Sequence, residues 1–450
     1  MIELLIGTLV TLAVGRYIFK GYSATGVLLS GGLLLLAITA LMGKAVLPAS
    51  VASTGHVATD MFEYVRFLLV DRGGGLGMLI MVLCGFAGYM SHIGANTILV
   101  KLASKPLGVI KSPYILLVAA YLVACAMSLA VSSATGLGVL LMATLFPLMV
   151  NMGISRGAAA AVCASPAAII LSPTSGDVVM AAQAANMELI EFAFKLTLPI
   201  SLVAIAAMAV THFFWQRYLD QKAGEHNAAV APSDLVTDAP GFYAILPFTP
   251  IIGVLLFDGK LGPKLDIVTI IVICLVLAAL LELVRKRNGR ELLDGLQVCW
   301  RNMADAFAGV VMLLVGAGVF AQGLMGLGFI ANLLDLAQSF GTGGIVIMLV
   351  LVVITTLAAF TTGSGNAPFY AFVELIPHLA TSLGVNPAYL VIPMLQASNL
   401  GRTISPVSGV VVACAGMGNL SPFEVVKRTS LPVAVGLLVV ILATQIMVPA

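Results

Sequence analysis

Long runs of apolar residues, separated by short polar stretches, fill almost the whole chain. About 20 consecutive apolar residues are enough for a helix to cross the hydrocarbon core of a bilayer, and several runs reach that length. The pattern therefore predicts an all-α polytopic membrane protein. The only sizeable polar linker is 217–241, and it separates a first segment, 1–216, from a second, 242–450.

Two of the apolar runs are interrupted near their middle by proline, glycine and hydroxyl residues. The run 155–187 is broken at SPTSGD, residues 172–177, and the run 386–418 is broken at SPVSG, residues 405–409. Lipid cannot satisfy backbone groups that leave a helix, so such a break persists only when it is buried in protein or lines a wet cavity. Both breaks are therefore candidate sites.

Two further stretches have the pattern of re-entrant hairpins, at about 113–150 and about 343–382. Each consists of an apolar arm, a tip of small and polar residues, and a second arm; the tips read SSATG and TTGSGN. In the first hairpin the second arm is short for a comfortable span, which favours a chain that turns back within the membrane.

The two segments repeat these features in the same order, which indicates an internal duplication. At one constant offset, four residues of the first break match four of the second: Ser172, Pro173, Ser175 and Gly176 align with Ser405, Pro406, Ser408 and Gly409. Each repeat is predicted to hold five transmembrane helices, one of them broken, plus one hairpin. Because five is odd, the second repeat inserts upside down, and inverted repeats with broken helices are typical of secondary transporters with a midplane site.

Composition and charge agree with a membrane protein. Of 450 residues 60% are hydrophobic and 9% charged, whereas a soluble domain has about a quarter charged residues. The net charge of +2 gives no indication of a nucleic-acid partner, and the six cysteines stand singly, as packing residues rather than metal ligands. Most of the 22 Lys and Arg fall on the side of the linker 217–241. The positive-inside rule makes that side cytoplasmic and puts both termini in the periplasm.

The breaks and hairpin tips create four helix N-termini near the midplane. Unpaired N–H groups and a partial positive charge at such ends attract anions, and the pseudo-twofold arrangement favours an anion with two charged ends. Each terminus contributes roughly 0.3–2 kcal/mol, so side chains or coupled cations must help to desolvate a dicarboxylate. The residues expected to bind the substrate are Ser132, Ser133, Thr135, Gly136, Thr174, Ser175, Thr361, Thr362, Ser364, Asn366, Asn399, Arg402 and Ser408.

Two charged residues lie at the depth of the breaks. Asp177 aligns with Val410 in the second repeat, so it has no counterpart; it either caps a helix or carries a coupled proton. Arg402 either pairs with Asp177 or the carbonyls of a break, or holds a substrate carboxylate, and we favour a role in substrate binding or gating. No metal or other cofactor is predicted.

Other classes of function fit the sequence less well. A zinc protease needs HExxH, which is absent, and an aspartyl mechanism needs a second carboxylate beside Asp177. A serine enzyme is not excluded by spacing, but no histidine or lysine lies near the serine-rich tips to act as its base. We therefore predict a transporter and not an enzyme. A channel and a carrier of another small organic anion remain as alternatives, although symmetric broken helices favour alternating access.

Long blocks of the chain closely resemble the anaerobic C4-dicarboxylate carriers of the DcuC type. They are KGYSATG at 20–26, SSATGLGVLLMATLFP at 132–147, SPTSGDVVMAAQA at 172–184, TTGSGNAPFYAFVE at 361–374 and QASNLGRTISPVSGVVVA at 396–413. The resemblance covers essentially the whole chain and is weakest in the linker. It implies a multi-pass protein of the bacterial inner membrane that carries succinate, fumarate or malate, chiefly for succinate efflux.

More distantly, the layout resembles the ion-transporter superfamily, which includes divalent-anion/sodium symporters. That resemblance implies a homodimer with an elevator mechanism, in which a scaffold of roughly 1–105 plus 242–340 flanks a transport domain of roughly 106–196 plus 341–428. The symporters carry Ser-Asn-Thr at both hairpin tips, whereas this chain has Ser-Ala-Thr and Gly-Ser-Gly-Asn. The difference favours proton-linked transport or dicarboxylate exchange over sodium coupling, with Asp177 as the proton carrier.

Overall fold

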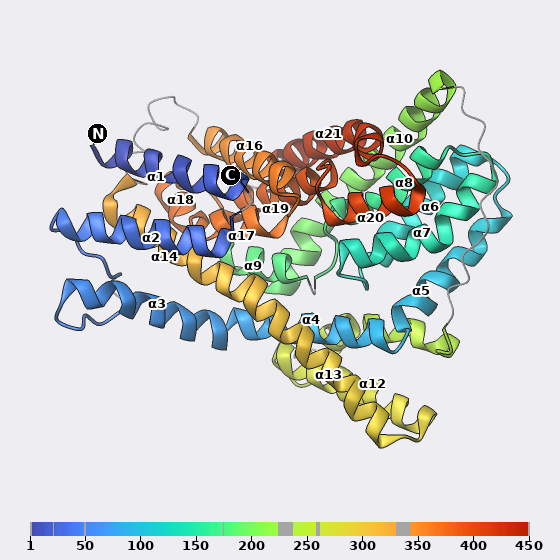
Figure 1. Ribbon diagram of the computed structural model, residues 1–450, viewed down its shortest axis with the longest axis horizontal. Helices are drawn as coiled ribbons and strands as arrows, with labels where there is room; N and C mark the ends of the chain where they lie inside the picture. The colour runs from blue at the N-terminus through green and yellow to red at the C-terminus, as the bar shows by residue number, and fades with distance from the viewer. Residues whose placement is uncertain are drawn as a thin grey trace.

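The computed structural model describes residues 2–20, 22–48, 51–173, 175–223, 237–257, 262–329 and 343–448, and these residues form helices and no strands (Figure 1). Seven of the described helices are long and apolar enough to cross a membrane, or eight if α3 and α4, which meet at a bend of 44°, form one span. The all-α, multi-span fold predicted from the apolar runs is thus confirmed for the described chain.

The first segment ends with the long helix α10. Its elements are α1 (Ile2–Phe19), α2 (Ala24–Leu41), α3 (Val57–Gly74), α4 (Leu76–His92), α5 (Ala95–Ser104), η1 (Lys105–Val109), α6 (Pro113–Met127), α7 (Ala134–Asn151), α8 (Arg156–Ala164), η2 (Pro166–Ala168), α9 (Gly176–Ala184), the π-helical turn η3 (Glu191–Thr197) and α10 (Leu198–Ala223).

The second segment ends with α21, which packs against α10. Its elements are η4 (Gly241–Phe248), α11 (Thr249–Leu256), α12 (Ile267–Lys286), α13 (Gly289–Ala306), the π-helical turn η5 (Phe307–Val311), α14 (Met312–Leu327), α16 (Gly343–Thr362), α17 (Asn366–Val373), α18 (Ile376–Leu383), α19 (Pro387–Thr403), α20 (Gly409–Gly418) and α21 (Pro422–Met447).

Both interrupted runs consist of two helical pieces with non-helical chain between them. In the first, α8 and η2 are followed by an unwound stretch and then α9; in the second, α19 and α20 flank residues 404–408. The proline of each break has no N–H to continue a helix, and a serine in extended conformation, Ser175 or Ser408, occupies the N-cap position of the next helix. The SPxSG pattern thus sets the start of the following helix, although α8 already ends at Ala164, eight residues before Ser172. We therefore count residues 165–175 as the first break and 404–408 as the second.

The hairpin stretches differ in detail from expectation. The second arm of the first, α7, has 18 residues and is long enough by itself to span, so its length does not support a re-entrant chain. The second arm of the other is divided into the short helices α17 and α18. The division of the chain into two inverted repeats stays a prediction.

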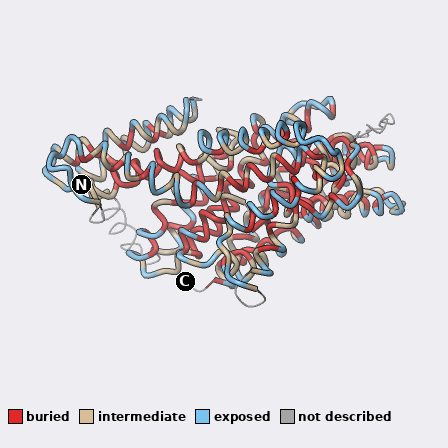
Figure 2. Tube along the Cα trace, turned by 90° about the horizontal axis from the view of Figure 1, so that it is seen from below, coloured by how far each residue is buried: buried red, intermediate tan, exposed pale blue. Residues whose placement is uncertain are grey.

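Each segment supplies an arm that packs against a half-helix of the other. Helix α7 packs against α20, and α17 packs against α9. In Figure 1, α3 and α4 run in line through the lower part of the molecule, α16 and α21 lie across the upper part, and α9 lies between them. Figure 2 shows that the buried positions run along the interior of this arrangement. Elements far apart in the sequence therefore meet around α9.

Two ion pairs that are largely shielded from solvent join distant helices. Arg428 of α21 is 1% exposed and contacts Asp220 of α10 at 2.6 Å and Glu424 of its own helix at 2.8 Å. Arg72 at the end of α3 contacts Glu374, the residue after α17, at 2.8 Å. Breaking a buried pair by removing one partner strands a charge, so both pairs resist separation of the helices that they join.

Candidate functional site

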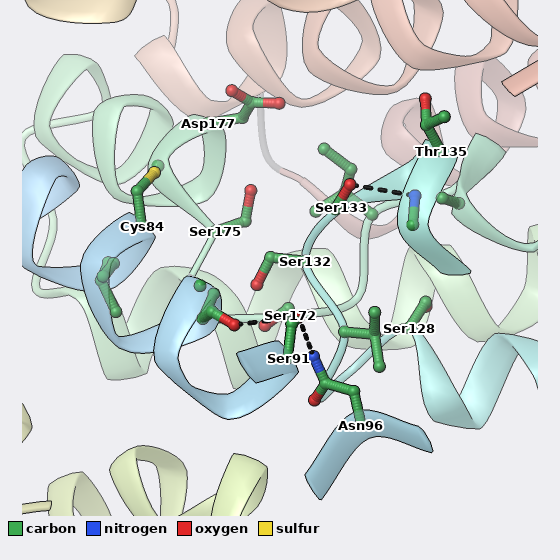
Figure 3. Close-up of a pocket in the computed structure, with 18 of the residues that line it drawn as sticks. Cys84, Ser91, Asn96, Ser128, Ser132, Ser133, Thr135, Ser172, Ser175 and Asp177 are labelled. Carbon is green, nitrogen blue, oxygen red and sulfur yellow. Dashed lines mark hydrogen bonds between the residues drawn. The ribbon is translucent and has the colours of Figure 1, made fainter. Parts of the chain in front are cut away.

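A cavity of about 860 Å³ lies where the first hairpin, the first break and α19 meet, and we call it the site cavity (Figure 3). Its wall also includes parts of α4, α5, α13, η5 and α17. The predicted scaffold and the predicted transport domain therefore both contribute to it.

Most of the residues predicted to bind substrate line this cavity. They are Ser132, Ser133, Thr135, Gly136, Ser175, Asn366, Asn399 and Arg402, and Asp177 lines it with them. Thr174 lies outside the described residues. The cavity wall does not include Thr361, Thr362, Ser364 and Ser408. The structure thus brings together residues that are up to 270 positions apart, between Ser132 and Arg402.

The four predicted residues that do not reach the cavity are occupied or enclosed elsewhere. The hydroxyls of Thr361 and Thr362 donate to backbone carbonyls one turn earlier in α16, at 2.8 and 2.7 Å. Ser364 Oγ accepts a hydrogen bond from Ala367 N at 3.4 Å, and Ser408 is fully buried. Gly363, whose φ of +70° is the left-handed conformation that favours glycine, lies so close to the backbone of Val407 and Ser408 that a Cβ atom would clash. The tip of the second hairpin therefore covers the second break.

Three helix N-termini open into the site cavity. Ser133 caps α7 by accepting a hydrogen bond from Gly136 N at 3.1 Å, so its hydroxyl is in use, while the hydroxyls of Ser132 and Thr135 are exposed in the cavity. Helix α9 begins there at Gly176, and α17 begins there at Asn366. The N-terminus of α20 is the one predicted anion-binding end that the cavity does not include.

Asp177 lies in the first turn of α9 and is 5% exposed. Tyr370 of α17 donates a hydrogen bond from its hydroxyl to Asp177 Oδ1 at 2.6 Å. Asn399 and Arg402 line the same cavity, but within the described chain no cation lies within ion-pair distance of the carboxylate. A carboxylate at this place interacts favourably with the helix dipole and also faces the cavity.

Arg402 lies in the last turn of α19, between the first break and the site cavity. Its Nη2 donates to the carbonyl oxygen of Ala167 at 3.0 Å, in the first break. Its Nε is buried and has no hydrogen-bond partner among the described residues. The guanidinium is thus bonded to a carbonyl of the break through Nη2, as one of the sequence alternatives has it, while the neighbouring Nε is a buried donor without a partner among the described residues.

Gln396, which the sequence analysis did not single out, holds the backbone of the first break. Its Oε1 accepts from Ile170 N at 2.9 Å, and its Nε2 donates to Ile170 O at 3.2 Å and to Ser201 Oγ at 3.1 Å. The side-chain amide therefore replaces the helical partners that Ile170 lacks. The only sign of this role in the sequence is that Gln396 is a single glutamine in an apolar run, about one and a half helical turns before Arg402.

Tyr370 and the polar residues of α4, α5 and α13 were also missed. Tyr370 lies one helical turn after Asn366 and hence on the same face of α17, a spacing that points to it once Asn366 is placed in the site. Asn96 of α5 and Asn302 of α13 line the cavity from the far wall. Each of the two is a single polar residue in an amphipathic or apolar run, and nothing in the sequence pattern predicts that it lies near the breaks.

The chain matches the family described as DcuC, C4-dicarboxylate anaerobic carrier, over residues 2–449. It is 70% identical over 448 residues to the anaerobic C4-dicarboxylate transporter DcuC of Escherichia coli K12, covering all of this chain and 97% of that protein. It is 62% identical over 452 residues to the probable anaerobic C4-dicarboxylate transporter DcuC of Vibrio cholerae, covering all of this chain and 98% of that protein.

Two solved transporters share the fold. The Alcanivorax borkumensis YdaH transporter superposes with a TM-score of 0.65 at 18% identity, covering 94% of this chain and 97% of its own. Neisseria gonorrhoeae MtrF superposes with a TM-score of 0.58 at 13% identity, covering 94% of each chain. At these identities the likeness concerns the fold alone.

Replacing Gln396 by leucine should destabilise the protein by about 1–3 kcal/mol, because the N–H of Ile170 would lose its bond to Gln396 Oε1, whereas the carbonyl oxygen of Ile170 would keep the hydroxyl of Ser201 at 3.3 Å. Thermal unfolding of the purified protein in detergent measures the change. Gln183→Leu is the matched control, since Gln183 is exposed and should unfold near the wild-type temperature. Equal stability of the two variants would show that water, and not Gln396, satisfies the break.

Proposed function

This chain belongs to the DcuC family of C4-dicarboxylate anaerobic carriers, and on that premise we propose that it is a secondary active transporter of C4-dicarboxylates such as succinate, fumarate and malate. Its relatives are named as transporters, and the chain is a multi-span membrane transporter rather than an enzyme. The proposal includes net efflux of succinate, or exchange of dicarboxylates, coupled to protons across the bacterial inner membrane.

The convergence of anion-binding groups on one cavity is the observation that carries the proposal. The N-termini of α7, α9 and α17 supply free N–H groups and partial positive charge, and Arg402 supplies a full charge with a free donor. The exposed hydroxyls of Ser132 and Thr135 add donors that suit a second carboxylate. A small dianion is the ligand that satisfies helix ends and a guanidinium together.

Asp177 is the residue that we assign to proton coupling. A carboxylate held by Tyr370 at the cavity wall takes up a proton when a dicarboxylate binds beside it, because the added negative charge disfavours the ionised form. Joint movement of the dicarboxylate and that proton couples net flux to protons, whereas exchange between loaded carriers needs no net proton transfer.

The position of the site cavity supports an elevator mechanism. One wall comes from α4, α5 and α13, within the predicted scaffold, and the opposite wall from the first hairpin, the first break, α17 and α19, within the predicted transport domain. Sliding of the second group past the first would carry the site across the membrane. We place both termini in the periplasm on the positive-inside rule, and we propose a homodimer by analogy with the superfamily.

Counterflow in proteoliposomes tests the function directly. Vesicles loaded with unlabelled succinate should accumulate labelled succinate transiently above equilibrium, which a carrier does and a channel does not. Fumarate and malate inside should also drive the uptake, whereas sodium outside should not change it. A panel with monocarboxylates and amino acids covers the alternative substrates; accumulation driven by those anions and not by dicarboxylates would overturn the proposal.

Arg402→Ala should lower succinate counterflow at least about tenfold, because a charge-assisted hydrogen bond to a carboxylate contributes about 1.5–3 kcal/mol. Arg156→Ala is the matched control: Arg156 also donates to a backbone carbonyl, Gly418 O at 3.0 Å, but does not line the site cavity. Gel filtration shows whether both variants remain folded. Transport by Arg402→Ala at the wild-type rate would contradict a substrate-binding role.

Asp177→Asn should flatten the pH dependence of net succinate flux while leaving succinate–succinate exchange active, since exchange needs no return of the empty carrier. The initial rate of net efflux is measured over a range of pH in proteoliposomes, next to the exchange rate at each pH. Glu191→Gln serves as control, because Glu191 is an exposed carboxylate at the start of η3 that pairs with Lys195. A pH profile like that of the wild type would leave Asp177 only its capping role.

A further inference from the structure

One side chain of the far wall has an unusual hydrogen-bonding state. Asn96, in the first turn of α5, lines the site cavity and is 4% exposed. Its Oδ1 is buried and has no hydrogen-bond partner among the described residues. A buried amide oxygen that lacks a donor costs free energy, so this oxygen should face a donor when the site is occupied.

The orientation of the Asn96 amide follows from its neighbours. Nδ2 donates to Ser91 Oγ at 2.7 Å, and the Ser91 hydroxyl in turn donates to Ala87 O at 3.2 Å (Figure 3). The serine has spent its only proton on a carbonyl, so it can only accept from Asn96. Turning the amide over would require the Ser91 hydroxyl to leave Ala87 O and donate to Asn96 instead, so the observed arrangement, with Oδ1 as a free acceptor, is the one that keeps both bonds.

The neighbours of Asn96 also mark the place where the site cavity adjoins a second one. Ser91, His92 and Thr97 line both the site cavity and a cavity of about 530 Å³ that reaches Arg285 and Lys286 at the end of α12. Figure 3 shows Asn96 and Ser91 on one side of the site cavity, away from Asp177, with Ser132 and Ser172 between. A ligand that enters from the second cavity meets the amide before it reaches the breaks.

The carboxylate oxygens of a fully ionised C4-dicarboxylate are acceptors only, and they cannot satisfy Oδ1. Among C4-dicarboxylates the groups that can are a hydroxyl or an ammonium on C2, or the proton of a singly protonated carboxyl. An acceptor that a substrate hydroxyl satisfies lowers the relative affinity for an analogue that lacks the hydroxyl, because the acceptor is then left unpaired.

We propose that Asn96 is a specificity-determining residue, whose Oδ1 accepts a hydrogen bond from the C2 hydroxyl or ammonium of a C4-dicarboxylate and so favours 2-substituted dicarboxylates over unsubstituted ones. This rests on the proposed function. Asn96 affects only the preference among dicarboxylates, through the one acceptor Oδ1. The carboxylates of the ligand are bound by Arg402 and the helix N-termini.

Asn96→Leu tests the proposal, since leucine has nearly the same size and Ser91 keeps its bond to Ala87. The half-saturation concentrations of malate, aspartate and succinate are measured in counterflow on the same proteoliposomes. The half-saturation concentrations of malate and aspartate should each rise about tenfold, which corresponds to the loss of about one hydrogen bond. That of succinate should change less than about twofold. If the half-saturation concentrations of all three substrates change equally, or if none of them changes, the inference is overturned. No change for any substrate is the result expected if a water molecule, and not the substrate, donates to Oδ1.

Asn302→Leu is the matched control. Asn302 is an amide on the same wall, from α13, with its Nδ2 bonded to Val298 O at 2.8 Å, and its side chain is only partly buried. Its replacement should leave the ratio of malate to succinate unchanged. A loss of malate preference in Asn302→Leu as large as in Asn96→Leu would show a general effect of wall polarity and overturn the role of Asn96.

Binding without transport gives a second readout. Cys84 lines the site cavity and is partly exposed, whereas the other five cysteines are buried. Protection of its thiol from a small maleimide therefore reports occupancy. If no dicarboxylate protects wild-type Cys84 or drives counterflow, the proposed function fails. If dicarboxylates protect it, and malate protects wild type and Asn96→Leu at the same concentrations, only the inference on Asn96 fails.

Ser91→Ala keeps the test decisive if Asn96→Leu does not fold. Alanine removes the partner of Nδ2 and keeps Oδ1, so the amide is free to turn. The concentration of malate that protects Cys84 should rise, with that of succinate unchanged. Protection by malate at the wild-type concentration in Ser91→Ala would overturn the claim that an oriented Oδ1 selects the substrate.

Discussion

The backbone of the first break must be satisfied without helical hydrogen bonds, and α19 supplies the partners. Gln396 bonds both the N–H and the C=O of Ile170, and Arg402 bonds the carbonyl of Ala167. Because these partners come from the other half of the chain, the break can stay open only while α19 lies beside it. The unwound segment and the packing of the two halves therefore depend on each other.

The start of α9 follows from that arrangement. The break ends at Ser175, so the helix begins at the cavity wall and Asp177 falls in its first turn. Helix α17 comes from the other half and places Tyr370 against the carboxylate at 2.6 Å. The residue that follows α17, Glu374, is held by Arg72 at the bend between α3 and α4. Helix α17 is thus fixed at one end by the site and at the other by the far helices.

Two nearly identical motifs have different surroundings. The first break lines the site cavity, whereas the second is covered by the tip of the second hairpin, where Gly363 lies against Val407 and Ser408. Ser175 and Ser408 are both helix N-caps, yet only the first reaches the cavity. A wall of α4, α5 and α13 faces the first break, and through Asn96 it adds an amide to the site. The cavity is asymmetric although the motifs that build it are paired.

The sequence alone determined the features that depend on local chemistry. Apolar runs of membrane length require helices, and a proline followed by serine and glycine marks where a helix begins after a break, so the helices, both breaks and nine of the residues that line the site cavity were predicted. The tertiary structure alone decided which N-termini share a cavity, that Gln396 and Tyr370 belong to the site, and that Arg428 is buried in an ion-pair network. A solitary glutamine or tyrosine in an apolar run has the same pattern whether it faces lipid, core or cavity. Its role is set by the residue that folding brings opposite to it, and that residue lies hundreds of positions away.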